Sequence, residues 1–335
     1  MFQKVSNMKA GSNPTMKDVA RECGLSLATV SKVINGQPVG KISRQKVEAA
    51  IEKLGYRVNA YARALKSSKT YSVALVMPSL KHPFFAHLTD ELTRALMSKG
   101  YRSQLVITNY DVEAEQKSFE MVRTNKMDGV IALTYSPNIA ASDSIPVVTI
   151  DRHLEPNVPC VSSDNYRGGE MAAEKLIELQ CRRLLFLRIT SPIQGEPNKR
   201  LAGFENVCKT RNIEYETCLI SDDEPEERIY HYLREHIREG AFEYDGIFCN
   251  SDMLARRVIR FLNESGISVP EQVQIIGYDG IIDRFMDRYV CSTIEQPISQ
   301  MAETAVNILL DFNEGTGGMS ICLPVRYVPG GTTKD

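Results

Sequence analysis

Apolar and polar positions between residues 15 and 36 follow the period of two short helices joined by a tight turn. Thr15 followed by Asp18 is a capping-box variant, so the pattern predicts a first helix from Met16 to Cys23. Gly24 is expected to end that helix, because glycine adopts the left-handed conformation that residues with a Cβ resist. The segment is therefore predicted to fold as a helical hairpin.

The second helix of the hairpin, which Ser26 is expected to cap, has two different faces. Helical periodicity places three apolar side chains in one arc that can pack on the first helix, namely Val30, Val33 and Ile34. Small or cationic side chains point away from it, namely Ala28, Ser31 and Lys32. A recognition helix presents such an arc to base edges in a DNA groove. On this pattern alone, an ordinary helical hairpin is an equally good interpretation.

A third helix and a conditional fourth follow the hairpin. Ser43 to Leu54 carries an i, i+3, i+4, i+7 apolar stripe, and Gly55 stops it. Residues 59–66 are rich in Ala and Arg and therefore favour a helix, but a helix of about two turns is marginal in water. We expect this segment to become helical only on binding a partner.

The remainder of the chain is long enough for two lobes with separate cores. Short β-rich runs alternate there with helical stretches such as Phe84 to Lys99. The runs are YSVALVM, SQLVIT, GVIAL, PVVTI, RLLFLR, ETCLI, DGIFC and VQIIG. This alternation predicts parallel sheets flanked by helices. We interpret it as two sheets, with a ligand cleft at the carboxyl ends of the strands.

Polar side chains follow several of these runs. Those expected at strand ends are Asp151, Arg152, Asp164, Asn165, Ser251, Asp252 and Asp279. Such a set suits a hydroxyl-rich ligand, because each group can bridge adjacent hydroxyls, and Phe84 or Phe85 can lie against an apolar sugar face. Asp164 and Asp252 have an alternative role as helix caps, and Phe85 has one as a core residue.

Charge is distributed unevenly along the chain. Residues 1–70 contain 13 of the 40 Lys and Arg but 4 of the 42 Asp and Glu, so a basic arm precedes an acidic body although the net charge is −2. A basic arm suits a polyanion, because neutralising phosphates releases counterions. The asymmetry favours DNA binding by the hairpin over a merely solvated charged surface.

Three segments, TMKDVARECGLSLATVSKVING, EKLGYRVNAYARALKS and the strand that opens the body, resemble the lactose-repressor (LacI/GalR-type) family of bacterial transcription regulators. The resemblance runs from about Thr15 to about Thr332. It implies that the headpiece contacts double-stranded operator DNA through Thr15, Leu27, Ala28, Thr29, Ser31, Lys32 and Asn35. Leu27, Ala28 and Lys32 match base-reading positions, and Thr29 and Ser31 match phosphate contacts.

The resemblance also implies a hinge helix. Asn59, Ala62 and Leu65 match residues that enter the minor groove, with Leu65 as an apolar wedge at a central C–G step of a pseudo-palindromic operator. The family most often has Arg in place of Lys32, and an ammonium cannot reproduce the bidentate contact of a guanidinium with guanine. The family usually has Pro in place of Val58, so the start of the hinge is less rigid here.

The implied fold is an N-terminal all-α helix-turn-helix headpiece plus an α/β periplasmic-binding-protein-like body of two parallel-sheet lobes. The expected domains are a disordered arm (1–14), the headpiece (15–58), a hinge helix and linker (59–70) and an effector-binding and dimerisation body (71–335). The chain should cross between the lobes near Asp164, Thr293 and Leu323. Lobe 1 is then about 71–164 and 294–322, and lobe 2 about 165–293 and 323–335.

By resemblance, the effector contacts are Phe84, Asp151, Arg152, Arg200, Ser251, Asp279 and Gln296. The family more often has Asn in place of Ser251, which weakens that assignment. Arg188 stands where the family generally carries small residues. Its guanidinium could reach an anionic group of the effector, or alternatively form an ion pair with a surface acid.

Several function classes lack support in the sequence. No apolar run reaches membrane-spanning length, and residues 1–14 lack the apolar segment of a signal peptide, so we expect a cytoplasmic protein. The eight cysteines and five histidines show no metal-ligand spacing, and EGTGGMS does not match a dinucleotide loop, so no metal or cofactor is expected. The leading hypothesis is a homodimeric repressor controlled by a small-molecule effector, which we expect to be a carbohydrate. The alternative is an α/β enzyme for sugars or nucleotides with a fused DNA-binding arm.

Overall fold

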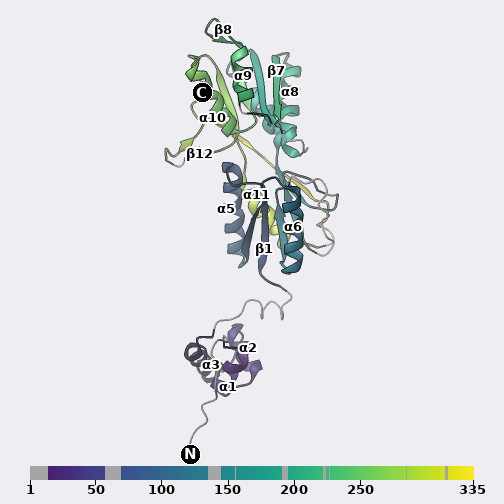
Figure 1. Ribbon diagram of the computed structural model, residues 1–335, viewed down its shortest axis with the longest axis vertical. Coiled ribbons are helices and arrows are strands. Elements are labelled where there is room, and N and C mark those ends of the chain that lie inside the picture. The colour runs from purple at the N-terminus through teal and green to yellow at the C-terminus, as the bar shows by residue number, and fades with distance from the viewer. Residues whose placement is uncertain are drawn as a thin grey trace, which may run out of the picture. The chain divides into compact units, whose positions relative to one another are not determined.

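The computed structural model describes residues 14–56, 69–134, 145–154, 156–190, 195–221, 224–225, 227–283, 285–313 and 316–335. It divides into two compact units, Met1–Thr70 and Tyr71–Asp335. Figure 1 shows a small helical unit and a larger body in which helices flank strands. The two units are described separately below.

The described part of the first unit contains helices α1 (Met16–Cys23), α2 (Leu27–Ile34) and α3 (Lys41–Leu54). The capping box is present as predicted, since Thr15 accepts from the backbone N–H of Asp18 and the Asp18 carboxylate accepts from that of Thr15. Gly24 ends α1 with a φ of 67°. A small apolar core ties the helices together through Val19, Val30, Val33, Val47, Ala50 and Tyr56. The predicted arc of α2 therefore packs inwards.

The body contains two six-stranded sheets. The first has the order β15-β5-β4-β3-β1-β2 and is parallel throughout. Its strands are β1 (Ser72–Met77), β2 (Arg102–Ile107), β3 (Gly129–Ala132), β4 (Val147–Ile150), β5 (Cys160–Ser163) and β15 (Ser320–Leu323). Helices α5 (Pro83–Ser98) and α11 (Ile298–Leu310) share one core with this sheet, and α6 (Val112–Thr124) packs in another.

The second sheet has the order β16-β14-β11-β10-β6-β7 and is parallel except for β16, which pairs antiparallel with β14. Its strands are β6 (Arg183–Thr190), β7 (Glu214–Ser221), β10 (Gly246–Cys249), β11 (Gln274–Asp279), β14 (Ser292–Glu295) and β16 (Arg326–Val328). Helices α7 (Asn165–Glu178) and α8 (Lys199–Arg211) contribute to one core, and α9 (Glu227–Glu235) and α10 (Asp252–Glu264) to the other. Short antiparallel ribbons join β8 (Ile237–Arg238) to β9 (Ala241–Phe242) and β12 (Ile282–Asp283) to β13 (Arg288–Tyr289).

The chain passes between the two sheets three times. The first passage follows β5 at Ser163 and the third follows β15 at Leu323, close to the predicted positions. The second passage lies at Gln296 and Pro297, a few residues beyond the predicted Thr293, because Thr293 to Glu295 pair within the second sheet. Three connecting segments therefore join lobes that have their own sheets.

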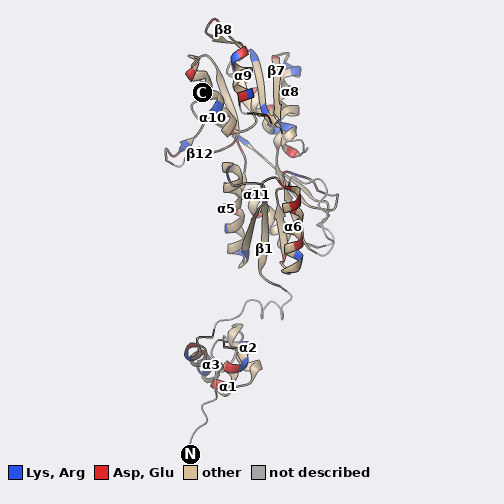
Figure 2. Cartoon of the chain, viewed as in Figure 1, with Lys and Arg blue, Asp and Glu red and all other residues tan. Residues whose placement is uncertain are grey.

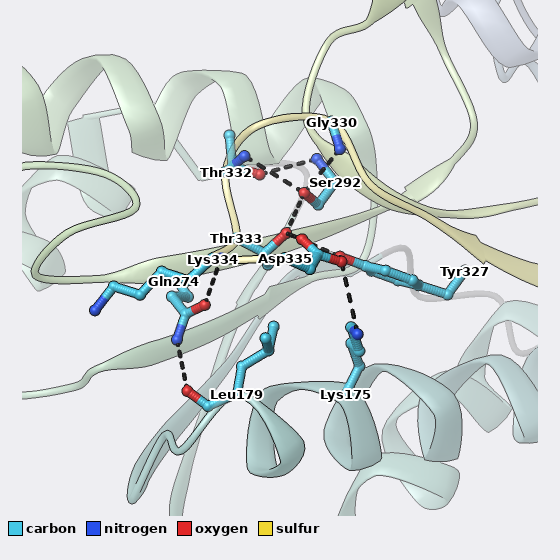
Figure 3. A network of polar contacts seen from close by, with 10 residues as sticks. All are labelled: Lys175, Leu179, Gln274, Ser292, Tyr327, Gly330, Thr332, Thr333, Lys334 and Asp335. Atoms are coloured by element: carbon cyan, nitrogen blue, oxygen red, sulfur yellow. Dashed lines mark hydrogen bonds and ion pairs between the residues drawn. The ribbon is translucent and has the colours of Figure 1, made fainter.

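Hydrogen bonds and other polar contacts hold the C-terminal residues against the second lobe (Figure 3). The backbone N–H of Lys334 donates to the Gln274 side chain over 2.8 Å, and the Gln274 amide donates to the carbonyl of Leu179 over 3.0 Å. The Tyr327 hydroxyl donates to the Asp335 carboxylate over 2.7 Å. These bonds hold the end of the chain against β11 and the end of α7.

Candidate DNA-binding and effector-binding sites

Helix α2 presents most of the predicted face to solvent. Ala28 and Lys32 are exposed and Ser31 is half-buried, whereas Val30 and Val33 are buried in the core of the unit. Leu27 is 41% exposed, although it is a large apolar residue at the start of the helix. A helix held by one apolar face with its other face open has the geometry required for insertion into a DNA groove.

The smaller polar residues of the predicted DNA-binding set stabilise the ends of the helices. Ser26 accepts from the backbone N–H of Thr29 over 3.1 Å, and the Asn35 amide donates to the Ser31 hydroxyl over 3.3 Å. Thr15 caps α1 in the same way, and Thr15 and Asn35 remain exposed. The predicted hinge residues Asn59, Ala62 and Leu65 lie outside the described residues.

Lysine or arginine residues occur in each of the described helices α1, α2 and α3 (Figure 2). Lys17, Lys32, Lys41, Lys46 and Lys53 are all exposed. Lys53 pairs with Glu22 over 2.6 Å and so links α3 to α1. Exposed cations of this kind suit contacts with a phosphate backbone.

In the body, a cavity of about 540 Å³ lies where strands of both sheets end. All eight residues predicted to contact an effector line it, namely Phe84, Asp151, Arg152, Arg188, Arg200, Ser251, Asp279 and Gln296. Phe84 and Phe85 are buried, contribute to the core of the first lobe and also line the cavity. The volume is within the range of small-molecule sites.

Each lobe contributes one buried acid to the lining of this cavity. Asp151 follows β4 of the first lobe with a φ of 56°, and Asp279 ends β11 of the second with a φ of 120°. Such backbone conformations are costly for residues other than glycine, and they cluster at functional sites. Burial raises the pKa of the Asp151 carboxyl to about 6, against a lowering influence from Arg200. Burial also raises the pKa of Asp279.

Each acid keeps one oxygen available. Oδ1 of Asp151 and Oδ2 of Asp279 are buried and have no hydrogen-bond partner within the part of the chain that the structure describes. Oδ2 of Asp279 lies 3.9 Å from Nε2 of His82, which belongs to the other lobe. Buried polar atoms are normally hydrogen-bonded, so these two oxygens are suited to accept ligand hydroxyls.

Arg200 is fixed at the second lobe's side of the cavity. Its Nε donates to Oδ1 of Asn165 over 2.7 Å, its Nη1 donates to the carbonyl of Asn250 over 2.6 Å, and its guanidinium lies 3.5 Å from the centre of the Tyr278 ring. Close packing of α7 on α8 sets this position, since a Cβ at Gly203 would lie 2.0 Å from the carbonyl oxygen of Tyr166. Arg200 is therefore preorganised before any ligand binds.

The structure gives two neighbouring strand-end residues different roles at the start of α10. Ser251, expected to be an effector contact, lines the cavity and also caps α10 by accepting from the backbone N–H of Leu254 over 3.3 Å. Asp252, expected to be that cap, is instead buried and accepts from the backbone N–H of Ile281 over 2.7 Å. Burial, followed by the neighbouring Asp279 carboxyl, raises the pKa of Asp252. Asp164 caps α7 as its alternative role predicted.

Several lining residues were not predicted, namely His82, Tyr110, Leu133, Ile189, Pro197, Asn250, Met253, Leu254 and Arg257. His82 caps α5 through Nδ1, which accepts from the backbone N–H of Phe84 over 3.3 Å. Its place in the short loop between β1 and α5 is the signal that could have found it, because ligands bind at such strand ends. Arg257 lies inside α10, and its periodicity does not distinguish it from a solvent-facing arginine.

Other site chemistry is limited in the described part of the chain. Among those residues, no group of His, Cys, Asp and Glu is placed to hold a metal ion. All eight cysteines are free thiols, and six are buried, while Cys23 is half-buried and Cys322 is exposed. No helix among the described residues is long and apolar enough to cross a membrane.

Both units of the chain match known protein families. Residues 15–59 match the model for bacterial regulatory proteins of the lacI family, and residues 70–328 match that for periplasmic binding proteins and the sugar binding domain of the LacI family. The sucrose operon repressor of Streptococcus mutans is 32% identical over 88% of this chain and 91% of its own. The ribose operon repressor of Bacillus subtilis is 31% identical over 96% and 98%.

Solved structures agree with this placement. A periplasmic binding protein/LacI transcriptional regulator of Alkaliphilus metalliredigens, complexed with D-xylulofuranose, matches with a TM-score of 0.69 and 28% identity over 79% of this chain and 100% of its own. The lac repressor dimer bound to operator has the same fold, with a TM-score of 0.82 at 22% identity over 96% and 99%. The chain belongs to the LacI family of bacterial transcription regulators, which join a DNA-binding headpiece to an effector-binding body.

Proposed function

We propose that this regulator is a homodimeric repressor whose affinity for its operator is controlled by a sugar or sugar derivative bound between the lobes of the body. The cavity carries the proposal, because it is lined from both lobes and because two of its lining acids, Asp151 and Asp279, each have a buried carboxylate oxygen without a hydrogen-bond partner among the described residues. The names of the relatives, which include sucrose and ribose operon repressors, favour a carbohydrate.

The assignment of effector contacts follows from the same geometry. Asp151 and Asp279 accept from hydroxyls, Arg200 donates to the ring or hydroxyl oxygens, and Phe84 lies against an apolar face of the sugar. Arg152, Ser251 and Gln296 complete the contacts. Because these residues come from both lobes, a ligand that bridges them favours one arrangement of the lobes over another.

The DNA half of the proposal assigns base contacts to Leu27, Ala28 and Lys32, and phosphate contacts to Thr29, Ser31 and the helix ends at Thr15 and Asn35. Asn59, Ala62 and Leu65 act in the minor groove as a hinge helix that forms on DNA. A pseudo-palindromic operator with a central C–G step requires two headpieces related by a twofold axis, hence the homodimer. A protein that controls operators works where the chromosome is, so we place it in the cytoplasm.

Operator binding in the presence of candidate ligands tests this function. Purified full-length protein is titrated onto labelled operator DNA, taken from the region beside its own gene, with and without each sugar of a panel. We expect at least one sugar to change the operator affinity and to be recovered chemically unchanged. A panel that leaves operator affinity unaltered, or a sugar that is turned over, would contradict the proposal.

A further inference from the structure

The wall of the cavity carries more positive than negative groups. Among the described residues that line it, four carry a guanidinium and two carry a carboxyl group: Arg152, Arg188, Arg200 and Arg257 against Asp151 and Asp279. Arg152, Arg188 and Arg200 are each 5–6% exposed. Ionised groups are costly to bury and favour an opposite charge nearby. A neutral sugar requires no such excess.

Arg188 is held in place by the turn that precedes α8. Its Nη2 donates to Oδ1 of Asn198 over 3.2 Å, and the same oxygen accepts from the backbone N–H of Gly195 over 3.1 Å. The amide oxygen of Asn198 orients the guanidinium through this bond. The turn therefore presents the cation at the carboxyl end of β6, where the cavity begins.

Arg152 lies against the same turn. A Cβ at Gly195 would lie 3.1 Å from Nη1 of Arg152, so the absence of a side chain at this position gives the guanidinium its room. The first turns of α8 and α10 also border the cavity, through Arg200 and Met253 respectively. The amino ends of helices carry partial positive charge, which adds to the field of the arginines.

We propose that the effector carries an anionic group, a phosphate monoester or a carboxylate, and that Arg188, with Arg152 and Arg257, forms the subsite that receives it. The inference rests on the proposed function and narrows its ligand class to an acidic sugar derivative. The acids Asp151 and Asp279 face the hydroxyls of the same molecule. Guanidinium groups suit the anion because they pair with phosphate or carboxylate oxygens through charge-assisted, often bidentate, hydrogen bonds.

Matched neutral and anionic probes test this subsite. The melting temperature of the full-length protein and its affinity for each probe are measured at constant ionic strength. The first set of probes is glucose, glucose 6-phosphate and gluconate, and the second is fructose and fructose 6-phosphate. Inorganic phosphate is measured alone. We expect an anionic member to stabilise the protein more than its neutral counterpart. Comparison of the phosphate esters with gluconate shows whether the subsite prefers a phosphate monoester or a carboxylate. Arg188→Gln should weaken binding of that anion by about ten-fold or more, with a smaller effect on the neutral sugar.

Three variants make the result specific. Arg182→Gln is the matched control, because Arg182 is exposed and does not line the cavity, and it should respond like the parent. Arg188→Lys keeps the charge and should recover part of the affinity. Arg257→Gln lies at a half-buried position, so it tests the subsite if Arg188→Gln does not fold.

Two outcomes overturn the inference. In the first, no anion in the panel raises the melting temperature of the protein in a way that depends on Arg188 or Arg257. The other is that a neutral sugar changes operator affinity equally in the parent and in Arg188→Gln, which leaves the proposed function standing and removes the anionic subsite alone. If instead no compound of either charge changes operator affinity, the proposed function itself is contradicted.

Discussion

The side-chain amide of Gln296 donates to Oδ1 of Asp279 over 2.8 Å, and its carbonyl oxygen accepts from the Ser163 hydroxyl over 2.8 Å. Asp279 faces the cavity, Gln296 lies on the second segment between the lobes, and Ser163 ends the strand before the first. All three residues are buried. Asp279, which lines the cavity, is thus linked through Gln296 to residues at two of the three connections between the lobes.

Gln296→Ala should weaken the response of operator affinity to effector more than it weakens effector binding itself. The alanine keeps Asp279 in the cavity but removes its link to Ser163, and allosteric coupling depends on such differential contacts. Titrations of effector alone, and of operator with effector, give both quantities. Gln300→Ala, at an exposed position of α11, is the control and should match the parent. Equal losses of binding and response would show that Gln296 is only a ligand contact.

Asp151→Asn should increase the free energy of unfolding of the body at neutral pH, and this gain should be smaller at acidic pH. The folded-state pKa is about 6 against an ordinary 3.8, so ionisation favours the unfolded state as pH rises between these values. The parent therefore loses up to about 3 kcal/mol of stability over that window, which the amide does not lose. Urea unfolding at pH 5 and pH 7.5 measures the difference. Asp311→Asn, at an exposed position, should show no such change with pH. A pH-independent gain for Asp151→Asn would argue against a raised pKa.

Gly203→Ala should displace α8 from α7 and with it Arg200. The added methyl group would lie 2.0 Å from the backbone oxygen of Tyr166, which cannot move aside as a side chain can. Overpacking of this kind costs about 1–3 kcal/mol, and effector affinity should fall as well. Thermal melts and effector titrations test both effects, with Ala202→Ser at the exposed neighbouring position as the control. Unchanged effector affinity would mean that this packing does not position Arg200.

Lys32→Ala should cost about 1–3 kcal/mol on the cognate operator and much less on random DNA, because base contacts discriminate between sequences. Lys32 is exposed on the outer face of α2. Fluorescence anisotropy on both DNAs measures the two losses. Lys46→Ala, on the exposed face of α3, is the control and should not change the preference between the DNAs. A loss of the same size on both DNAs would make Lys32 a phosphate contact.

Local signals were enough to predict the helices of the first unit. The Thr15–Asp18 capping box, the Gly24 stop and the apolar spacing of α2 each depend on residues within a few positions of one another. The parallel sheets followed from the alternation of apolar runs with helices. The positions of site residues at the ends of β4, β10 and β11 followed from the rule that parallel strands end at a common edge.

The remaining features depend on contacts between distant parts of the chain. Ser251 and Asp252 are adjacent, and sequence alone does not reveal which one caps α10 and which one meets Ile281. The approach of His82 to Asp279 joins residues from different lobes. The position of the second passage between the lobes, predicted near Thr293, depends on the pairing of β14 with β16, which extends the second sheet to Glu295. Arg257 has no local signal at all.

The response of operator binding to effector in Asp279→Ala tests the central claim most directly. Asp279 lines the cavity, has a buried oxygen without a hydrogen-bond partner among the described residues, and lies in the body rather than in the DNA-binding unit. Operator affinity without effector should match that of the parent, while effector affinity should fall by about 1–3 kcal/mol or more. The concentration of effector needed to change operator binding should rise correspondingly, whether the effector releases the operator or recruits the protein to it. An effector response identical to that of the parent would show that Asp279 is only a structural acid at the end of its strand, and would contradict this account of the site.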